Sequence, residues 1–284
     1  MCKSMNKVVY HYCGVDTFFN IIENSSMWLS DISKSNDYQE CVRCREFVNK
    51  GMEEYLRDDV EALKAWGIWY ENGVHSNFLM KTFCVCFSES KDKLSQWRGY
   101  AQDGKGIAIG FDKEVLEELN QISEFHTAFG KVIYDDPQEY VQGIIADNIK
   151  KLEYKGVGHV ALELNGNYRM QFPFVKNPGF KEEKEWRAVV CSAIGHYNIP
   201  NSENILFSKV KYRTANNKLI PYIEMNFERV KQSIIKEIFI GPKSEVEIED
   251  IVNLLSFYGY YDGIEGGYNS QKPVVIKKSS TTYR

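Results

Sequence analysis

The sequence predicts an α+β fold in a single domain, residues 1–284, with helices at the periphery of a sheet. Short runs of β-branched and aromatic residues recur along the chain and are typical of buried strands. Longer segments of helical periodicity interrupt them, above all a helical insertion at about residues 38–75. The strands outnumber the long helices and do not alternate strictly with them, which argues against a doubly wound sheet.

The first half of the chain contains four predicted strands, at residues 8–12, 27–30, 81–87 and 106–111. A short helix is expected after three of them, because an aspartate able to accept hydrogen bonds from first-turn N–H groups precedes each helical pattern. These predicted caps are Asp16, Asp92 and Asp112. The pattern of residues 38–70 predicts two charged helices in this insertion, with the break between them near Gly51 or Asp58-Asp59.

The second half begins with a predicted strand at residues 128–134 and a helix that starts at Asp136-Pro137. Proline is favoured at the first helical position, so this start is well marked. Helices extend to about residue 174 with an interruption near Gly156. The remaining predicted elements are strands at 184–191, 237–241 and 273–278, a hairpin formed by 207–212 and 219–225, and a helix at 244–257.

Composition excludes some classes of protein. The chain has 284 residues with a net charge of −4 and a pI near 5.9, which argues against a protein that mainly coats nucleic acid. The first residues lack the apolar stretch of a signal peptide, and no run approaches the length of a membrane span. We therefore expect a cytoplasmic protein with reduced cysteines and no membrane contact.

An unusual row of charges lies where residues 180–190 change from a polar to an apolar pattern. Side chains alternate across a strand, so Glu183, Glu185 and Arg187 are predicted to share one face. Buried charge is costly unless it is paired. The row is therefore either a solvated sheet edge or a functional site, and the sequence leaves both interpretations open.

Several other polar residues follow predicted strands. Ser88 and Ser90 end the strand at 81–87, where they are either ordinary capping residues or hydroxyls at the mouth of a cleft. Trp97 and Tyr100 lie one helical turn apart and share a face, which is typical of core packing. His11 lies on the first strand, where a single histidine is more often structural.

Two weaker motifs favour ordinary structure. Cys41-x-x-Cys44 together with Cys84-x-Cys86 supplies four thiols, but no histidine joins them at metal-ligand spacing, so no metal is expected. The segment Asp103-Gly104-Lys105-Gly106 runs into a strand, whereas a phosphate-binding loop runs into a helix. We interpret it as a turn.

Several motifs together resemble a bacterial family known only as domain of unknown function twenty-nine seventy-one. The most specific are Phe87-Ser88-Glu89-Ser90 and Glu183-Lys184-Glu185-Trp186-Arg187. Further matching segments, over nearly the whole chain, are Tyr10-His11-Tyr12, Trp28-Leu29-Ser30, Gln96 to Ala101, Lys176 and Ile238 to Gly241. This resemblance implies no particular activity.

A second resemblance, to mono-ADP-ribosyltransferases of the Arg-Ser-Glu type, does imply one. That family carries a polar first-strand residue, a Ser-x-Ser and a late Glu-x-Glu, and His11, Ser88-x-Ser90 and Glu183-x-Glu185 occur in that order. The resemblance implies a split mixed sheet that binds NAD, as substrate, in a cleft. The first-strand arginine is replaced by His11, and Arg187 shares the face of the carboxylates.

The resemblance also implies roles for these residues. Glu185 would stabilise the positive charge that develops on the ribose, and Glu183 would receive the acceptor's proton. The residues implied to contact NAD are His11, Tyr12, Ser88, Ser90, Tyr100 and Arg187. The implied activity is ADP-ribosyl transfer or NAD glycohydrolysis, as in bacterial toxins and phage-defence effectors, and the acceptor is not identified by the sequence.

Two other functions stay open. In a metal-dependent nuclease or other phosphoester hydrolase, Asp37, Glu183 and Glu185 would bind a divalent ion with Lys176 nearby. In a non-catalytic binding protein, Arg187 would neutralise Glu185, and the row would be a structural ion pair.

Overall fold

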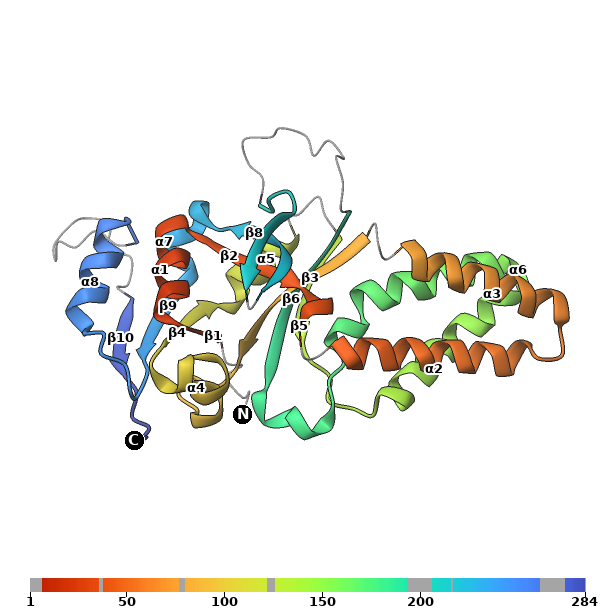
Figure 1. Cartoon of the computed structure of the whole chain (residues 1–284), viewed down its shortest axis with the longest axis horizontal. Coiled ribbons are helices and arrows are strands. Elements are labelled where there is room, and N and C mark those ends of the chain that lie inside the picture. The colour runs from red at the N-terminus through yellow and green to blue at the C-terminus, as the bar shows by residue number, and fades with distance from the viewer. Residues whose placement is uncertain are drawn as a thin grey trace, which may run out of the picture.

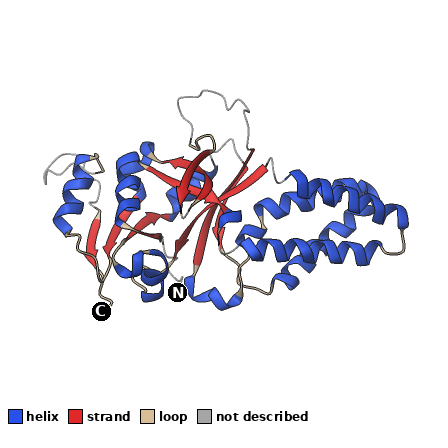
Figure 2. Cartoon of the chain, viewed as in Figure 1, coloured by secondary structure: helices blue, strands red, loops and turns tan. Residues whose placement is uncertain are grey.

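A computed structural model describes residues 7–35, 38–76, 80–121, 126–193, 206–215, 217–260 and 274–283. Its centre is a mixed sheet whose main path runs β10-β9-β4-β1-β3-β2-β8-β7, with β6 on β3 and β5 on β6 (Figures 1 and 2). The strands are β1 Val8–Cys13, β2 Ser26–Asp31, β3 Met80–Ser88, β4 Ile107–Asp112, β5 His126–Lys131, β6 Glu185–Ala193, β7 Lys211–Ala215, β8 Lys218–Asn226, β9 Ile235–Ile240 and β10 Val275–Lys278. Only the pairing of β10 with β9 is parallel among these strands, so the mixed α+β architecture is confirmed.

The sheet forks at β3. One edge of β3 pairs with β6 along its whole length, from Met80 to Ser88. The other edge is shared, because β1 pairs only at Ser88 and β2 pairs only at Phe83 and Cys84. The stretch of β3 around Cys86 therefore lies between two diverging strands.

The helices fall into two groups (Figure 1). They are α1 Val15–Asn24, α2 Tyr38–Leu56, α3 Val60–Ser76, α4 Leu94–Tyr100, α5 Lys113–Gln121, α6 Pro137–Met170, α7 Lys231–Ile234 and α8 Ile248–Phe257. Short 3₁₀ turns are η1 Ile32–Lys34, η2 Gln102–Gly104, η3 Phe172–Phe174, η4 Pro178–Glu183 and η5 Glu228–Val230. Helices α1, α5, α7 and α8 supply buried side chains to the core of the sheet, whereas α2, α3 and α6 form a separate arm.

The arm extends from one end of the sheet and has its own apolar core (Figures 1 and 2). Met52, Trp66 and Val141 are among its buried residues. The predicted insertion is thus a helical hairpin, completed by α6 from a distant part of the sequence. Its break lies at Asp58-Asp59, between α2 and α3, while α2 continues through Gly51. The interruption predicted in α6 is present at Gly156, whose φ of 75° and ψ of 166° suit glycine alone.

Two of the four predicted aspartate caps are confirmed. The Asp112 carboxylate accepts hydrogen bonds from the first turn of α5, and Asp136 does the same for α6. The prediction for Asp16 is wrong, since Gly14 occupies the cap position and α1 begins at Val15, which places Asp16 inside the first turn. The prediction for Asp92 is also wrong, because Lys93 precedes α4 and the Asp92 carboxylate accepts from the indole of Trp97 instead.

The two faces of the sheet differ in character, and this difference positions the site. On β3, Phe83, Val85 and Phe87 point into the main core together with Ala188 and Val190 of β6. The alternate residues point to the opposite face, which carries the polar side chains. Helix α4 covers part of that face over β1, where Trp97 packs on Tyr12. None of the described helices is long and apolar enough to cross a membrane.

Candidate functional site

The polar face of β3 and β6 brings three of the predicted site residues together, Ser88, Glu185 and Arg187. Glu185 is paired with Ser88, and Arg187 is paired with Cys86, across the antiparallel ladder. Directly opposed residues of such a ladder point to the same face, about 5 Å apart. The prediction that Glu185 and Arg187 share a face is confirmed, and Ser88 lies beside them.

Glu183 reaches the same place by a different route from the one predicted. It ends the turn η4, and Lys184, with a φ of 47°, separates it from the first residue of β6. The prediction that Glu183 lies on the same strand face as Glu185 and Arg187 is therefore wrong, because β6 begins only at Glu185. The Nζ atom of Lys176 joins the two carboxylates, at 2.6 Å from Glu183 Oε2 and 3.0 Å from Glu185 Oε2.

The Glu185 carboxylate is held on two sides by cations. Nε and Nη2 of Arg187 donate to its two oxygens at 2.8 and 3.1 Å, a bidentate pair, and Lys176 adds a third bond. Arg187 is 1% exposed, Lys176 2% and Glu185 5%. With Glu183 the cluster has two carboxylates and two cations, so the buried charge is balanced, as burial requires.

The surroundings keep Glu185 ionised. Burial raises the pKa of its carboxyl, but the Arg187 guanidinium and the Lys176 ammonium lower it by more, so the net shift is downward. The remaining Nη1 of Arg187 donates to the carbonyl of Pro173 in η3. The backbone N–H of Glu185 donates to the hydroxyl of Tyr134, at 2.8 Å. Hydrogen bonds thus fix both ends of this ion pair.

Cys86 lies beneath the ion pair on β3. A hydrogen bond with the Cys84 thiol, burial and the nearby Glu185 carboxylate together raise the pKa of the Cys86 thiol well above its usual value. A thiol with a raised pKa is protonated at neutral pH and is a poor nucleophile. Cys86 therefore acts as a hydrogen-bond donor to the carboxylate.

The two serines stabilise the end of β3. The Oγ atom of Ser88 donates to the backbone carbonyl of Glu183 at 2.6 Å and accepts from the N–H of Ser90 at 3.1 Å. The carbonyl of Ser90 accepts from the hydroxyl of Tyr12 at 2.7 Å. Ser88 therefore lies next to Glu185, as predicted, while its hydroxyl holds the turn that presents Glu183.

His11 closes the fork in the sheet. Its Nδ1 atom lies 3.0 Å from the carbonyl oxygen of Cys86, at the point where β1 has left β3 and β2 has not yet joined it. Burial lowers the pKa of the His11 imidazole, and the Cys86 carbonyl offsets this only in part. A neutral ring that donates from Nδ1 satisfies a carbonyl that the divergent strands leave unpaired.

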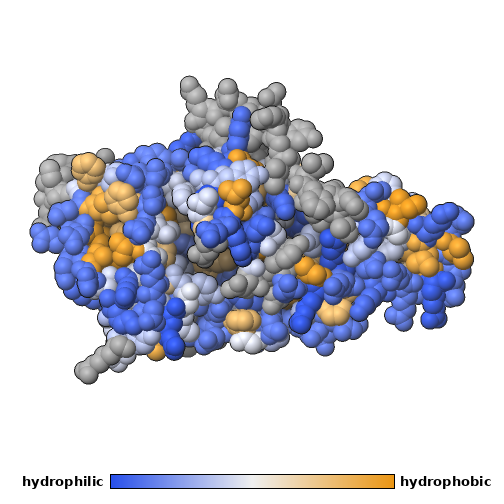
Figure 3. Space-filling view, in the orientation of Figure 1, coloured by the Kyte–Doolittle hydropathy of each residue, from blue (hydrophilic) through white to orange (hydrophobic). Residues whose placement is uncertain are grey.

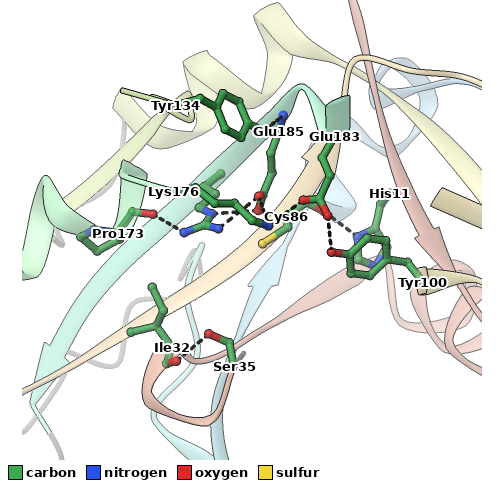
Figure 4. Close-up of polar contacts among 11 residues, drawn as sticks. His11, Ile32, Ser35, Cys86, Tyr100, Tyr134, Pro173, Lys176, Glu183 and Glu185 are labelled. Carbon is green, nitrogen blue, oxygen red and sulfur yellow. Dashed lines mark hydrogen bonds and ion pairs between the residues drawn. The ribbon is translucent and has the colours of Figure 1, made fainter. Parts of the chain in front are cut away.

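The accessible part of the cluster is formed by Glu183 and Tyr100. Figure 4 shows the Glu183 carboxylate between Lys176 and Tyr100, whose hydroxyl donates to Glu183 Oε1 at 3.0 Å. The Glu183 side chain is 13% exposed, against 6% for that of Glu185, and Tyr100 is 51% exposed. The space-filling view shows a recess on the face of the molecule below the β7–β8 hairpin (Figure 3).

Sequence reasoning overlooked three contributors to the cluster. Cys86 could have been found, because it precedes Ser88 by two residues and so shares its face. Tyr134 and the Pro173 carbonyl carry no local motif, and only the tertiary fold brings them to β6. Among the described residues, no group of three or more His, Cys, Asp or Glu side chains could hold a metal ion. Asp37, proposed above as a metal ligand, lies outside the described residues.

One known protein family matches the segment of the chain that contains the charged cluster. Residues 96–188 match the model of a protein family of unknown function, DUF2971. The DUF2971 match contains Tyr100, Lys176, Glu183, Glu185 and Arg187, while His11, Ser88 and Ser90 precede it. No curated protein and no solved structure matches the chain. The family resemblance is therefore supported over the segment that supplies every charge of the cluster.

Proposed function

We propose that the protein is an NAD-consuming enzyme, an ADP-ribosyltransferase or NAD glycohydrolase, in which Glu183 is the acting carboxylate. The observation that carries this proposal is the position of Glu183. Its carboxylate is partly exposed and is held between a buried ammonium group and the hydroxyl of an exposed tyrosine. A fixed carboxylate that is open to solvent suits a reaction in which positive charge develops on the substrate.

Glu183 is better placed for this role than Glu185. Arg187 and Lys176 engage both oxygens of Glu185, and its side chain is 6% exposed. A substrate could reach it only by displacing a buried, bidentate partner, which is energetically costly. Glu185 and Arg187 instead fix Lys176, and Lys176 fixes Glu183. The roles expected from the resemblance are therefore reassigned within the same set of residues.

The chemistry follows from the cleavage of the nicotinamide–ribose bond. The bond between ribose C1′ and the pyridinium nitrogen breaks with its electron pair on the nitrogen, which leaves as neutral nicotinamide. Water or an acceptor nucleophile bonds to C1′, and its proton passes to the Glu183 carboxylate. The same carboxylate stabilises the oxocarbenium-like transition state, while Tyr100 can exchange its bond to Glu183 for a ribose hydroxyl.

A second candidate function is a non-catalytic binding protein. The bidentate pair between Arg187 and Glu185 favours it, because a neutral, buried and fully hydrogen-bonded cluster also suits a structural role. In this alternative, Glu183 and Tyr100 are the edge of a docking surface, and no bond in NAD is broken.

The test is the release of nicotinamide from NAD, measured by chromatography with and without added protein or nucleic acid as acceptor. We expect release by the parent protein, and a rate about 10²–10³-fold lower for Glu183→Gln at an unchanged melting temperature. Glu182→Gln is the matched control, since Glu182 is the adjacent exposed carboxylate and pairs with Lys93 at the surface. It should retain full activity.

Two results would reject the enzymatic proposal. One is the absence of nicotinamide release by the folded parent protein under every acceptor condition, which would leave the binding protein. The other is equal activity of Glu183→Gln and Glu182→Gln. A parallel assay with magnesium and nucleic acid tests the phosphoester hydrolase alternative.

A further inference from the structure

Trp28 is an exposed tryptophan on an inner strand of the sheet, on the same face as the charged cluster. Ser30 pairs with Cys84, so Trp28 and Ser30 of β2 lie on the face that carries Cys86 and Arg187. The alternate residue Leu29 is buried in the main core. Trp28 is nevertheless 41% exposed, although β2 is flanked by β3 and β8. A large indole surface is thus open to solvent beside the fork.

The Trp28 ring is held in place from the side of the β7–β8 hairpin. The centroids of the Tyr222 and Trp28 rings lie 4.6 Å apart, with the ring planes at 34° to each other. The Arg213 guanidinium carbon lies 5.7 Å from the centroid of the Trp28 ring. Nη2 of Arg213 donates to the Ser30 hydroxyl at 3.3 Å. The aromatic surface is therefore fixed before any ligand arrives, which reduces the entropy lost on binding.

Arg213 retains unused binding capacity. Its Nε atom is buried and finds no hydrogen-bond partner among the described residues. Leaving a charged donor unpaired is costly, so a movement of the Arg213 side chain that brought Nε to an anion would gain more than an ordinary surface contact. The nearby acidic residue does not oppose an anion, because Glu224, opposite Trp28, is already paired with Lys211 at 2.6 Å.

We propose that Trp28, Tyr222 and Arg213 form a nucleotide subsite. The base stacks on the Trp28 indole, and a phosphate group contacts the Arg213 guanidinium. Stacking on an indole accepts any base, and a guanidinium suits phosphate oxygens. The chemical class of ligand is thus a planar heteroaromatic ring that carries phosphate.

The distance to the charged cluster suits one ligand that spans both places. Where both strands pair with β3, at Ser30 and Val189 on either side of Cys84, β2 and β6 lie two strand spacings apart, about 10 Å. Trp28 lies two residues further along the diverging end of β2, and an extended dinucleotide is longer than two strand spacings. The link to catalysis rests on the proposed function, whereas the subsite itself rests only on these contacts.

The test uses AMP, adenosine and inorganic phosphate as probes, titrated calorimetrically into the full chain. Trp28→Ala should weaken AMP binding by about 10- to 100-fold, the usual loss when a stacking side chain is removed. Trp28→Phe should retain part of the affinity, which guards against a general folding defect. Trp69→Ala is the matched control, since Trp69 on the arm is 40% exposed and should not affect binding.

Arg213→Met tests the phosphate contact. It should reduce the affinity for AMP to that for adenosine, while adenosine itself binds as to the parent protein. The subsite is rejected if the folded parent protein binds no AMP, or if Trp28→Ala and Trp69→Ala bind it equally. AMP binding that depends on Trp28 without any nicotinamide release would uphold the subsite and reject the proposed enzyme. Nicotinamide release by Trp28→Ala with an unchanged KM for NAD would uphold the proposed enzyme and reject the subsite.

Discussion

Replacing Glu185 by glutamine should destabilise the protein strongly. The substitution keeps the size of the side chain and removes the charge that Arg187 and Lys176 share. These cations are 1% and 2% exposed, so two buried positive charges would then face the single carboxylate of Glu183. Breaking a buried ion pair by removing one partner costs about 3–5 kcal/mol. One carboxylate remains near Lys176, and Arg187 keeps its bond to Pro173, so we expect the lower end, about 3 kcal/mol.

Urea denaturation at neutral pH, followed by circular dichroism, measures this change in the free energy of unfolding. A loss of about 3 kcal/mol corresponds to a fall in Tm of roughly 6–12 °C. Glu182→Gln is the control, since exposed ion pairs contribute about 0–1 kcal/mol. If the free energies of unfolding of Glu185→Gln and the control agree within about 1 kcal/mol, the argument that Glu185 neutralises a buried cluster is refuted.

Two further predictions concern the elements around the cluster. Burial lowers the pKa of His11, so its contribution to stability is present above its unfolded pKa of about 6.5 and is lost as the pH falls. His11→Asn, which keeps a donor, should therefore show a smaller fall in Tm between pH 7 and pH 5 than the parent, and an equal fall would contradict this. Asp92 accepts hydrogen bonds from Trp97, Ser279 and Ser280. Asp92→Asn should accelerate amide hydrogen exchange in residues 279–283, whereas protection equal to that in the exposed-residue control Asp147→Asn would exclude this role.

Local sequence patterns were sufficient to predict the core strands, because each strand has a composition that is recognisable without its neighbours. The strands at 8–12, 81–87 and 106–111 are short runs of β-branched and aromatic residues, and each became a strand of the core. Their order in the sheet was not predictable in this way. Pairing partners such as Ser30 and Cys84 are distant in sequence, and no local pattern records which edge of β3 they share.

The aspartates at the starts of helices show the same limit of local sequence patterns. Asp112 and Asp136 cap the helices that follow them, as predicted, because the next residues continue into the first turn. Asp92 is also an aspartate that precedes a helix, yet its carboxylate accepts hydrogen bonds from Trp97 and from the C-terminal segment. A tertiary partner almost two hundred positions away competes successfully with the local cap, and the local sequence gives no sign of it.

The charged cluster explains why alternation along a strand points to the buried carboxylate and not to the more accessible one. Residues two apart on a strand face the same way, so a Glu and an Arg at that spacing meet each other, as Glu185 and Arg187 do. The clearest pattern in the sequence therefore marks the carboxylate that is most completely neutralised. Glu183 lies outside the strand and is directed by the left-handed Lys184 and by Lys176. Because no periodic pattern fixes its direction, its carboxylate can lie at the edge of the cluster, where it is partly exposed to solvent.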